Sequence, residues 1–588
     1  SLLYTPATLV SGRELPMHLG LPTRSVHGLP IIEHAEFGRN VPDEAMPDED
    51  KMNLGKIYHM GKEEAAELLL NRQAMASHTF ITGSTGTGKS NAVYHLLDEI
   101  TKNGQTTFLV VEPAKGEYKN VFGNCTDVQV FGTNPRETPL LRMNPFAFPE
   151  NIHILEHIDR LVEIFNACWP MYAAMPAVLK DAIERSYQKV GWDLRNSESE
   201  KGVFPTFFDL LDILPGVIEE SHYSKDTQSD YVGALCTRVK SLTNGIYGSV
   251  LCAEDALTDE ALFDRNVIVD LSRVGSMETK SLLMGILVMK LQEYRMCSSG
   301  MNSRLRHVTV LEEAHNLLRK TSAEQSQEGA NLQGKSVEML ANAIAEMRTY
   351  GEGFIIADQA PGLLDMSVIR NTNTKIILRL PDEEDRKLVG KSAALKEAQI
   401  DELSKLPLGV AAVYQNEWPE AVLCKIEAYP MPENAVYHKP SKMPHEINAE
   451  FVFGQLAVGK ELEPLSSSEM EQLKLWLKRH ETVLKPEDSR YLERVFAGGE
   501  LDVAKTRKAV FDFFGGIGTV VDYCVAAEKS LTPRKEFLEQ LQGQYGLKAA
   551  AADWVLNSVI SMGMSLNPDA KAVDNLRTNF EQQGGRVL

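Results

Sequence analysis

The sequence predicts an α/β fold in which helices cover a parallel-rich sheet built around a glycine-rich loop. Three observations predict this class. Short β-rich runs alternate with helical patterns from about Leu54 to Glu427, which is typical of parallel strands joined by helical crossovers. A glycine-rich stretch at residues 83–90 lies between a strand-like run and a helix start. Helical patterns dominate two further stretches, about 151–248 and 450–588, and predict an inserted helical subdomain and a helical C-terminal domain.

In chain order, residues 1–54 are irregular and proline-punctuated, and we interpret them as an irregular or β-rich segment, compatible with the remainder of a longer N-terminal domain. Residues 55–427 form the expected core, with the helical insertion at about 151–248. Several prolines among polar residues at 428–449 predict a linker. In the C-terminal domain Ser468 is a candidate helix cap, and the apolar residues that follow it fall on one helical face (Met470, Leu473, Trp476 and Leu477).

Six runs in the core have strand length and β-branched content, so they predict buried strands. They are Thr106–Val111, Asn266–Leu271, Val308–Leu311, Phe354–Ala357, Lys375–Leu380 and Gly409–Tyr414. In the insertion, Ile154–Phe165 and Pro176–Val190 predict helices. The spacing His153-Ile154-Leu155-Glu156-His157 fits the H-x-x-E-H pattern of a zinc protease, but it lies in this helical region with no obvious third ligand. We interpret both histidines as ordinary helix residues.

Composition is that of a globular protein of 588 residues, with 43% hydrophobic and 24% charged residues. The longest apolar run, Leu282 to Met289, is too short to span a bilayer, and the start shows no signal-peptide pattern. The seven cysteines are scattered without a C-x-x-C pair, which argues against a disulfide or zinc framework and favours a reducing compartment. We therefore expect a cytoplasmic protein without an integral membrane segment. The net charge of −20 argues against broad adhesion to nucleic acid, but it allows a few basic groups inside a pore.

The motif at residues 83–90 matches G-x-x-x-x-G-K-[ST] at every fixed position, after the strand-like Thr79-Phe80-Ile81. Glycines in such a loop let backbone N–H groups converge on a triphosphate at the positive end of a helix. Lys89 is placed to reach the β- and γ-phosphates, and Ser90 to ligate Mg²⁺. We assign ATP contacts to the loop and the helix start: Gly83, Ser84, Thr85, Gly86, Thr87, Gly88, Lys89, Ser90 and Asn91.

A second apolar strand ends in two acids, at His307-Val308-Thr309-Val310-Leu311-Glu312-Glu313. Glu312 is directed towards the Mg²⁺ shell, and Glu313 is placed to polarise the attacking water. The next strand ends at Gln359, whose amide is our candidate sensor of the γ-phosphate. Ring-shaped ATPases complete each site with an arginine from the neighbouring subunit, and the candidates are Arg348, Arg370 and Arg379.

Six motifs in a fixed order carry a family resemblance: GSTGTGKS, VVEPAKGEY at residues 110–118, LEEAHNLL at 311–318, EMRTYG at 346–351, ADQAPGLL at 357–364 and NTNTKIILRL at 371–380. Over roughly residues 20–427 the chain resembles the HerA/FtsK superfamily of ring ATPases. It is most similar to the HerA branch and also resembles the ATPases of conjugative type IV secretion. The E-A-H of LEEAHNLL also fits DEAH-box helicases, but their downstream motifs do not follow.

This resemblance implies a RecA-like core that assembles as a homo-hexamer around a channel for double-stranded DNA, with ATP and Mg²⁺ as cofactors. It implies that Glu313 is the catalytic base, Gln359 the sensor and Glu117 the acid after the second strand. Glu312 stands where the family commonly has aspartate, and Thr349 where lysine is common.

HerA-like rings in bacteria belong to DNA end-processing and anti-phage modules, so the resemblance also implies a separate effector, such as a nuclease or a sirtuin-like protein. Two other functions stay open at this stage: a secretion ATPase that powers transfer of DNA or protein, and a ring scaffold that regulates an effector by nucleotide state. The polar segment Arg319–Ser336 is either a solvated loop or a pore loop that contacts phosphates through Arg319, Lys320 and Lys335.

Overall fold

The structure is a computed structural model that describes most of the chain. The described residues are 25, 27, 34–41, 46–172, 174–199, 202–221, 223–253, 256–321, 329–431, 435–440, 486–496, 502–529, 532–545, 549–567 and 569–585. They fall into two compact units, the first ending at Lys439 and the second holding the C-terminal helices. Each unit is described by itself below.

Eleven strands of the described residues form one sheet in the first unit, in the order β2-β1-β13-β12-β11-β3-β10-β9-β4-β8-β5. The seven strands from β11 to β5 run parallel, and the remaining four are antiparallel. The α/β class and the parallel-rich sheet predicted from the sequence are confirmed. The strands are β1 Lys51–His59, β2 Lys62–Asn71, β3 Thr79–Thr82, β4 Thr107–Glu112, β5 Val128–Gly132, β8 Asn266–Asp270, β9 His307–Glu312, β10 Glu352–Asp358, β11 Thr374–Ile377, β12 Val410–Gln415 and β13 Val422–Ile426.

Each of the six predicted strand runs coincides with a strand, but β11 is shorter than predicted. It ends at Ile377 rather than Leu380, because the residues that follow it cross to the glycine-rich loop, where the Arg379 carbonyl accepts the Ser84 N–H at 3.0 Å. The sequence did not predict the hairpin of β1 and β2. The exposed edge strand β2 has the sequence KEEAAELLLN, whose residues favour helices in isolation. It pairs with β1, which in turn pairs with β13.

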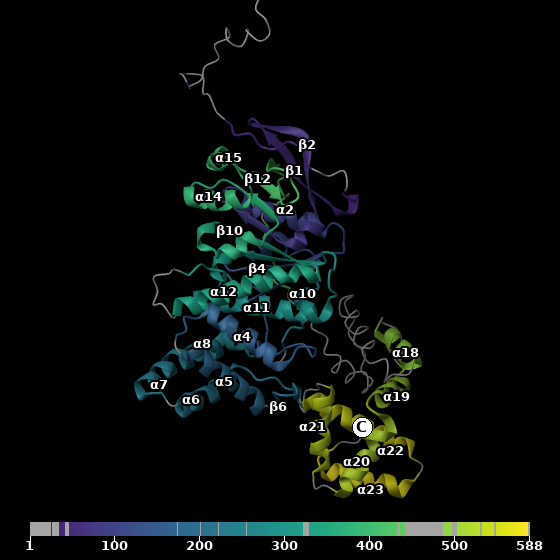
Figure 1. The fold of residues 1–588 in the computed structure, drawn as a ribbon. Coiled ribbons are helices and arrows are strands. Elements are labelled where there is room, and N and C mark those ends of the chain that lie inside the picture. Colours follow the sequence, from purple (N-terminus) through teal and green to yellow (C-terminus); the bar gives the residue numbers. More distant parts are fainter. Residues whose placement is uncertain are drawn as a thin grey trace, which may run out of the picture. The chain divides into compact units, whose positions relative to one another are not determined.

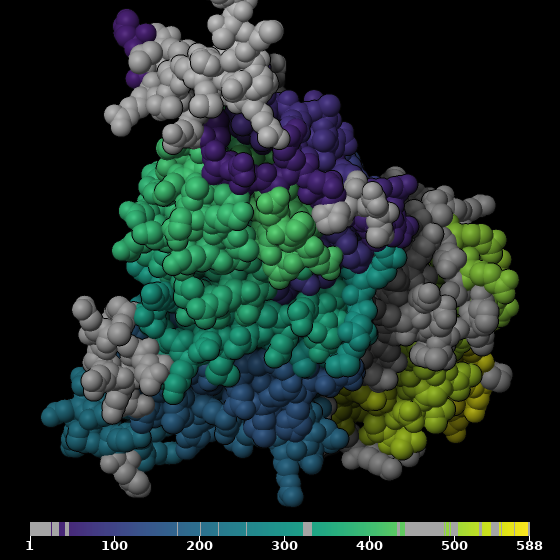
Figure 2. Space-filling model, turned by 45° about the horizontal axis from the view of Figure 1, so that its top comes forward, coloured from purple at the N-terminus to yellow at the C-terminus, as the bar shows by residue number. Residues whose placement is uncertain are grey.

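The sheet therefore reaches into the segment 1–54, since β1 begins at Lys51. Most of that segment lies outside the described residues. On the surface of the first unit, the purple N-terminal strands adjoin the green residues that end the core (Figure 2). Segments almost 400 positions apart in sequence thus meet at this side of the sheet.

Alternating side chains of the parallel strands divide the core between the two faces of the sheet, as expected for buried strands. On one face Ile81, Val310 and Ile355 pack with α2 (Lys89–Thr101) and α3 (Tyr118–Phe122). On the other face, Phe80 and Leu311 belong to a cluster that includes α11 (Met277–Ser298) and α12 (Gly329–Glu346). Shorter helices complete the unit: α10 Asp259–Phe263, α13 Met366–Arg370, α14 Glu383–Ser392 and α15 Glu397–Glu402.

Helices α4 to α9 lie between β5 and β8 in the chain. Helix α4 packs against α11 and α12, and α5 and α6 follow it on the side away from the sheet (Figure 1). Their bounds are α4 Ile154–Cys168, α5 Met175–Lys189, α6 Phe207–Glu220, α7 Lys225–Tyr231, α8 Thr237–Thr243 and α9 Gly245–Leu251, with a small hairpin of β6 Trp192–Asp193 and β7 Glu198–Ser199. The two helices predicted here are confirmed.

The two histidines of the H-x-x-E-H spacing have separate structural partners. His153 caps α4 by accepting the Leu155 N–H at 3.2 Å, and buried His157 lies 3.0 Å from Glu293 on α11. They do not face a common centre.

The segment after β13, part of the expected linker 428–449, lies against the first unit in its described residues. Asn124 donates to the Val436 carbonyl at 2.8 Å and accepts the His438 N–H at 3.1 Å, while Asn120 accepts the Tyr437 N–H at 3.0 Å. These side-chain amides hold an irregular backbone that has no sheet partner. Residues 441–449 lie outside the described part.

The second unit is helical. Its helices are α18 Pro486–Phe496, α19 Val503–Phe513, α20 Gly516–Lys529, α21 Pro533–Tyr545, α22 Ala549–Leu566 and α23 Ala570–Gln582. Apolar α22 contacts α19, α20, α21 and α23, and its Val555 and Ile560 are buried in a separate core. The helix predicted after Ser468 lies outside the described residues. Among those described, no single helix is long and apolar enough to cross a membrane, and only the bent pair Ala504–Phe513 with Gly516–Ala527 passes on length and composition.

Candidate active site

The glycine-rich loop connects β3 to the N-terminus of α2 in a tight, left-handed path. Gly86 and Gly88 have φ angles of 76° and 104°, a region that side chains with a Cβ rarely enter. Gly83 is needed for space, since a Cβ there would lie 2.7 Å from the Leu378 side chain. The loop backbone therefore closes around the start of α2, where free N–H groups and the helix dipole favour an anion.

Two neighbouring segments hold this loop in place. The Ser84 N–H donates to the Arg379 carbonyl after β11 at 3.0 Å, and the Gly409 N–H before β12 donates to the Thr87 carbonyl at 3.0 Å. Within the loop, the Thr87 hydroxyl donates to the Ser84 carbonyl at 2.7 Å. These bonds leave the N–H groups at the start of α2 free to bind a ligand, so the loop is pre-organised for phosphate.

Lys89 meets the two acids that the sequence analysis singled out. Its Nζ lies 3.1 Å from Glu312 Oε2 and 3.4 Å from Glu313 Oε1. The side chains of Lys89 and Glu312 are each only 8% exposed, and that of Glu313 is 14% exposed. Burial lowers the pKa of Lys89, but the two carboxylates outweigh it and hold the pKa above its ordinary value. Lys89 is therefore charged over the physiological pH range.

Gln359 bridges the loop and the second acid. Its Oε1 accepts the Thr85 hydroxyl at 2.7 Å, and its Nε2 donates to Glu313 Oε1. This placement follows from the parallel pairing of β10 with both β3 and β9, which brings the carboxyl ends of the three strands to one edge. Gln359 thus links Thr85 of the loop to Glu313 at the end of β9.

Glu313 has a backbone conformation that its residue type rarely adopts. Its φ is 45°, in the left-handed region, directly after β9. Such strain commonly occurs where a side chain is aimed for function. The conformation turns the chain sharply, so that Glu313 and Glu312, which follow one another in sequence, can both face Lys89.

His315, which was not among the predicted site residues, also belongs to this group. Its Nδ1 lies 2.9 Å from Asp358 Oδ2 and 3.6 Å from Glu313 Oε2. The hydrogen bond to Asp358 raises the pKa of His315 above its ordinary value. The ligand atoms of Glu313, His315 and Asp358 lie within 4.8 Å of one another. The only sequence signal for His315 was its place in LEEAHNLL. Its hydrogen-bond partner Asp358 lies at the end of another strand, β10, so the sequence did not reveal the contact.

The residues assigned to Mg²⁺ fit that ion by their chemistry. Ser90 supplies a hydroxyl in the first turn of α2, and Glu312 supplies a buried carboxylate at the end of β9. Oxygen ligands of this kind are those that Mg²⁺ prefers. The side chain of Asn91, a residue that we assigned to ATP, contacts the segment after β13. It donates to the Glu427 carbonyl at 3.0 Å and accepts the Tyr429 N–H at 2.9 Å.

Glu117 lies apart from these groups. Its side chain is 48% exposed, and among the described residues its ion-pair partner is Lys115, at 3.7 Å. Its backbone N–H donates to Glu112 Oε1 at 2.7 Å, so it takes part in the turn after β4 through its main chain. The structure does not bring the Glu117 carboxylate to Lys89 or Glu313 of the same chain.

The three candidate arginines divide between opposite edges of the sheet. Arg379 follows β11 at the loop edge, whereas Arg348 precedes β10 and Arg370 precedes β11 at the other edge. Strand β10 has seven residues and is therefore about 20 Å long. All three arginines are exposed. Arg348 and Arg370 are thus too far away to serve the loop of their own chain.

The segment expected to be a pore loop begins beside the site. Its first residues pair with the chain after Gln359: the Lys320 N–H donates to the Leu363 carbonyl at 2.8 Å, and Arg319 forms an antiparallel bridge with Leu364. Lys335 lies exposed on α12. Residues 322–328 lie outside the described part. The loops after β9 and β10 are therefore joined just beyond Glu313 and Gln359.

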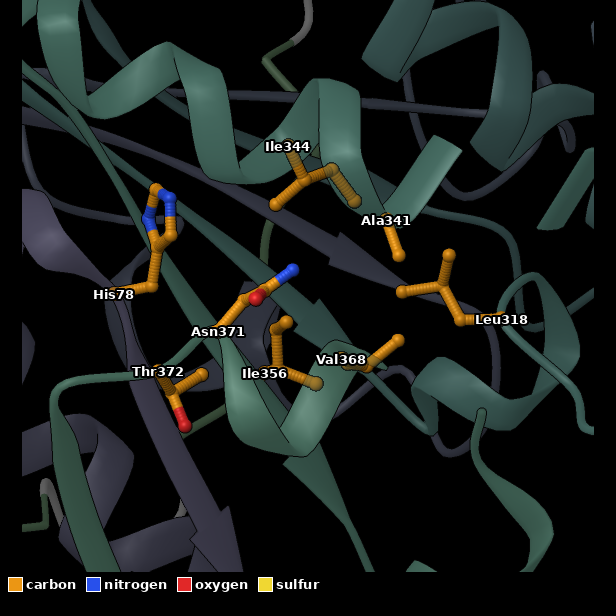
Figure 3. A pocket seen from close by; sticks show the side chains of 8 residues that line it. All are labelled: His78, Leu318, Ala341, Ile344, Ile356, Val368, Asn371 and Thr372. Atoms are coloured by element: carbon orange, nitrogen blue, oxygen red, sulfur yellow. The ribbon is translucent and has the colours of Figure 1, made fainter. Parts of the chain in front are cut away.

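A pocket of the first unit lies elsewhere. It is formed between α12, α13 and the sheet, where Ala341, Ile344, Ile356 and Val368 face one another (Figure 3). Its lining combines five apolar residues with His78, Asn371 and Thr372, and it includes none of the loop or acidic residues. We interpret it as a packing gap beneath α12 rather than as a ligand site.

Comparisons with known proteins show what the chain is similar to. Residues 52–289 match the family model described as Helicase HerA, central domain. A probable helicase of Methanocaldococcus jannaschii is 22% identical over 436 residues, which is 68% of this chain and 76% of the relative. The DNA double-strand break repair helicase HerA of Sulfolobus acidocaldarius is 25% identical over 393 residues, 64% of this chain and 69% of the relative. VirB4 of Thermoanaerobacter pseudethanolicus is similar in fold, with a TM-score of 0.50 at 19% identity, over 66% of this chain and 98% of that one.

Proposed function

We propose that this chain is a P-loop ATPase of the HerA/FtsK type, a ring-shaped motor that uses ATP and Mg²⁺ to move double-stranded DNA; its similarity to HerA helicases supports the proposal. One observation carries the proposal. Lys89, Glu313 and Gln359 converge beside a pre-organised phosphate loop, at one edge of a parallel sheet. That arrangement supplies the groups that phosphoryl transfer to water requires.

Each residue has a distinct role in this proposal. Lys89 and the loop N–H groups bind the phosphates, and Ser90 and Glu312 would hold Mg²⁺, which neutralises phosphate charge when bound. Glu313 orients the attacking water and accepts its proton, since its carboxylate is the one in contact with both Lys89 and Gln359. Gln359 reports the terminal phosphate, because it touches the loop through Thr85 and the base directly.

We further propose that six copies form the ring and that each ATP site lies between two of them. Support comes from Arg348 and Arg370, which are exposed at the edge of the sheet opposite the loop. A neighbouring subunit can present such an arginine to the phosphates, where it stabilises charge in the transition state. Arg379, at the loop edge, would act within its own chain.

Double-stranded DNA is the proposed cargo, and a separate effector, such as a nuclease or a sirtuin-like protein, is the proposed partner in the cytoplasm. Exposed Lys335 and the segment beginning at Arg319 and Lys320 are the proposed phosphate contacts. In a chain with a net charge of −20, attraction to DNA has to come from such local groups. Anti-phage defence or DNA end processing is the proposed setting.

The test is ATP turnover by the purified protein, with and without long duplex DNA. We expect turnover that requires Mg²⁺ and rises with duplex DNA. Glu313→Gln should abolish both turnover and its stimulation. If the protein hydrolyses ATP but duplex DNA changes neither its turnover nor its sedimentation, even with the effector present, the motor is refuted and a scaffold is favoured. Stimulation by a membrane-associated protein substrate instead of DNA would favour a secretion ATPase.

A further inference from the structure

The first acid of the site is held by two donors from different elements. Glu312 Oε1 accepts the Tyr118 hydroxyl at 2.6 Å, and Glu312 Oε2 lies 3.1 Å from Lys89 Nζ. We propose that Tyr118 is a positioning residue: its hydroxyl fixes Glu312 Oε1, so that Oε2 is presented to the Mg²⁺ side of the phosphate loop. This inference rests on the proposed function, because it concerns the same ATP site.

Glu312 has a particular need for such a contact. A glutamate has one more rotatable bond than an aspartate, so its carboxylate can reach more positions from the same backbone. Ordering that extra torsion costs free energy unless a neighbour holds the carboxylate. A hydrogen bond from a neutral hydroxyl to a buried carboxylate is among the stronger ones in proteins. The Tyr118 contact therefore selects one orientation of Glu312.

Tyr118 is itself held rigidly. It is 2% exposed, and its backbone N–H donates to Glu112 Oε2 at 3.1 Å at the end of β4. Its ring packs edge-on against Tyr94 of α2, with centroids 4.9 Å apart. Because β4 and β9 pair in parallel, with Val111 opposite Leu311, the turn that carries Tyr118 lies beside Glu312. A hydroxyl buried in this way cannot exchange its partner for solvent.

The neighbouring Glu117 does not provide this contact. Its carboxylate is half exposed beside Lys115, whereas the next residue, Tyr118, reaches the end of β9. In the G-E-Y turn, the group that touches the acidic end of β9 in the same chain is the tyrosine hydroxyl.

The experiment removes that hydroxyl with Tyr118→Phe in the full chain. Mg²⁺ is titrated while binding of a fluorescent ADP analogue is followed, and the Mg²⁺ dependence of ATP turnover is measured alongside. We expect the Mg²⁺ concentration for half-maximal binding to rise about tenfold, the lower end of what loss of an outer-shell partner of a metal ligand costs. Glu312→Asp, whose shorter side chain draws back from the hydroxyl, should raise it similarly.

A matched control is Tyr187→Phe. Tyr187 is a fully buried tyrosine in α5 whose hydroxyl donates to the Phe146 carbonyl, in the helical insertion. Loss of the Tyr187 hydroxyl should lower the melting temperature about as much as Tyr118→Phe does. It should leave the Mg²⁺ dependence of nucleotide binding unchanged. Mere loss of stability would therefore not move the readout.

A double-mutant cycle tests whether Tyr118 acts through Glu312. Added to Glu312→Asp, Tyr118→Phe should change the Mg²⁺ midpoint less than about twofold, because the contact is already broken. Two results overturn this inference alone, provided that the wild type is active. One is an Mg²⁺ midpoint that Tyr118→Phe leaves unchanged, and the other is an equal shift of that midpoint by Tyr118→Phe in the wild type and in Glu312→Asp. A wild type that shows no Mg²⁺-dependent nucleotide binding overturns the proposed function, and this inference with it.

Discussion

Replacing Glu313 with glutamine should separate ATP binding from ATP hydrolysis. Glutamine has the same length as glutamate and keeps an oxygen that can accept the Gln359 amide, so the bridge between Gln359 and position 313 can persist. It cannot accept a proton from water. Loss of a general base commonly lowers a rate by about 10²–10⁴-fold, equivalent to about 3–5 kcal/mol of transition-state stabilisation.

Nucleotide binding should not weaken in the same variant. Lys89 keeps Glu312 at 3.1 Å, the shorter of its two carboxylate contacts. The substitution also removes a negative charge beside an anionic ligand, which reduces electrostatic repulsion. We therefore expect the dissociation constant for ATP to stay the same or fall, while turnover falls at least about a hundredfold.

The assay pairs phosphate release with binding of a fluorescent ATP analogue at saturating Mg²⁺. Glu397→Gln, an exposed acid in α15, is the control and should match the parent in both measurements. If Glu313→Gln turned over ATP within about threefold of the parent, the assignment of the general base would be wrong. If it failed to bind ATP, Glu313 would be part of the binding site rather than the base.

Three further predictions concern binding, subunit sharing and DNA. Lys89→Ala should abolish ATP binding in the same fluorescence assay, because the buried ammonium group of the loop motif is lost. If Arg348 or Arg370 acts in trans, mixing subunits that lack that arginine with Lys89→Ala subunits should restore up to about a quarter of parental turnover. About a quarter of the shared sites in a random mixture combine an intact Lys89 with an intact arginine from the neighbouring subunit. Mixing with Arg379→Ala should restore none, because Arg379 lies at the loop edge of its own chain; the reverse result would refute this division. Lys335→Ala should weaken duplex binding equally for all sequences and make the slope of log K against log salt shallower by about 0.9. Anisotropy at several salt concentrations measures this slope, and an unchanged slope would exclude the contact.

Local sequence patterns determined a large part of this protein. The loop at 83–90, the strand before it and the helix after it are encoded within about twenty neighbouring residues, since glycine spacing and apolar runs act on the nearby backbone. Six buried strands were predictable for the same reason. The pairing of Glu312 with Glu313 at a strand end was also visible, because both follow one apolar run.

Only the tertiary structure decided which of these residues meet. The order β11-β3-β10-β9-β4 sets the loop beside strands that are about 200 to 300 residues further along the chain, and no local pattern specifies that order. It places Gln359 against Glu313, His315 against Asp358, and Tyr118 against Glu312.

The same order also separates residues that are close together in the sequence. Arg348, Arg370 and Arg379 lie within about thirty residues of one another, yet they occupy opposite edges because a parallel strand separates its two ends. Asn91 follows the phosphate motif directly, but its side chain binds the segment after β13. The residue types and their local conformations were thus set by sequence, and their partners were set by strand order, since contacts between distant segments depend on how the whole sheet assembles.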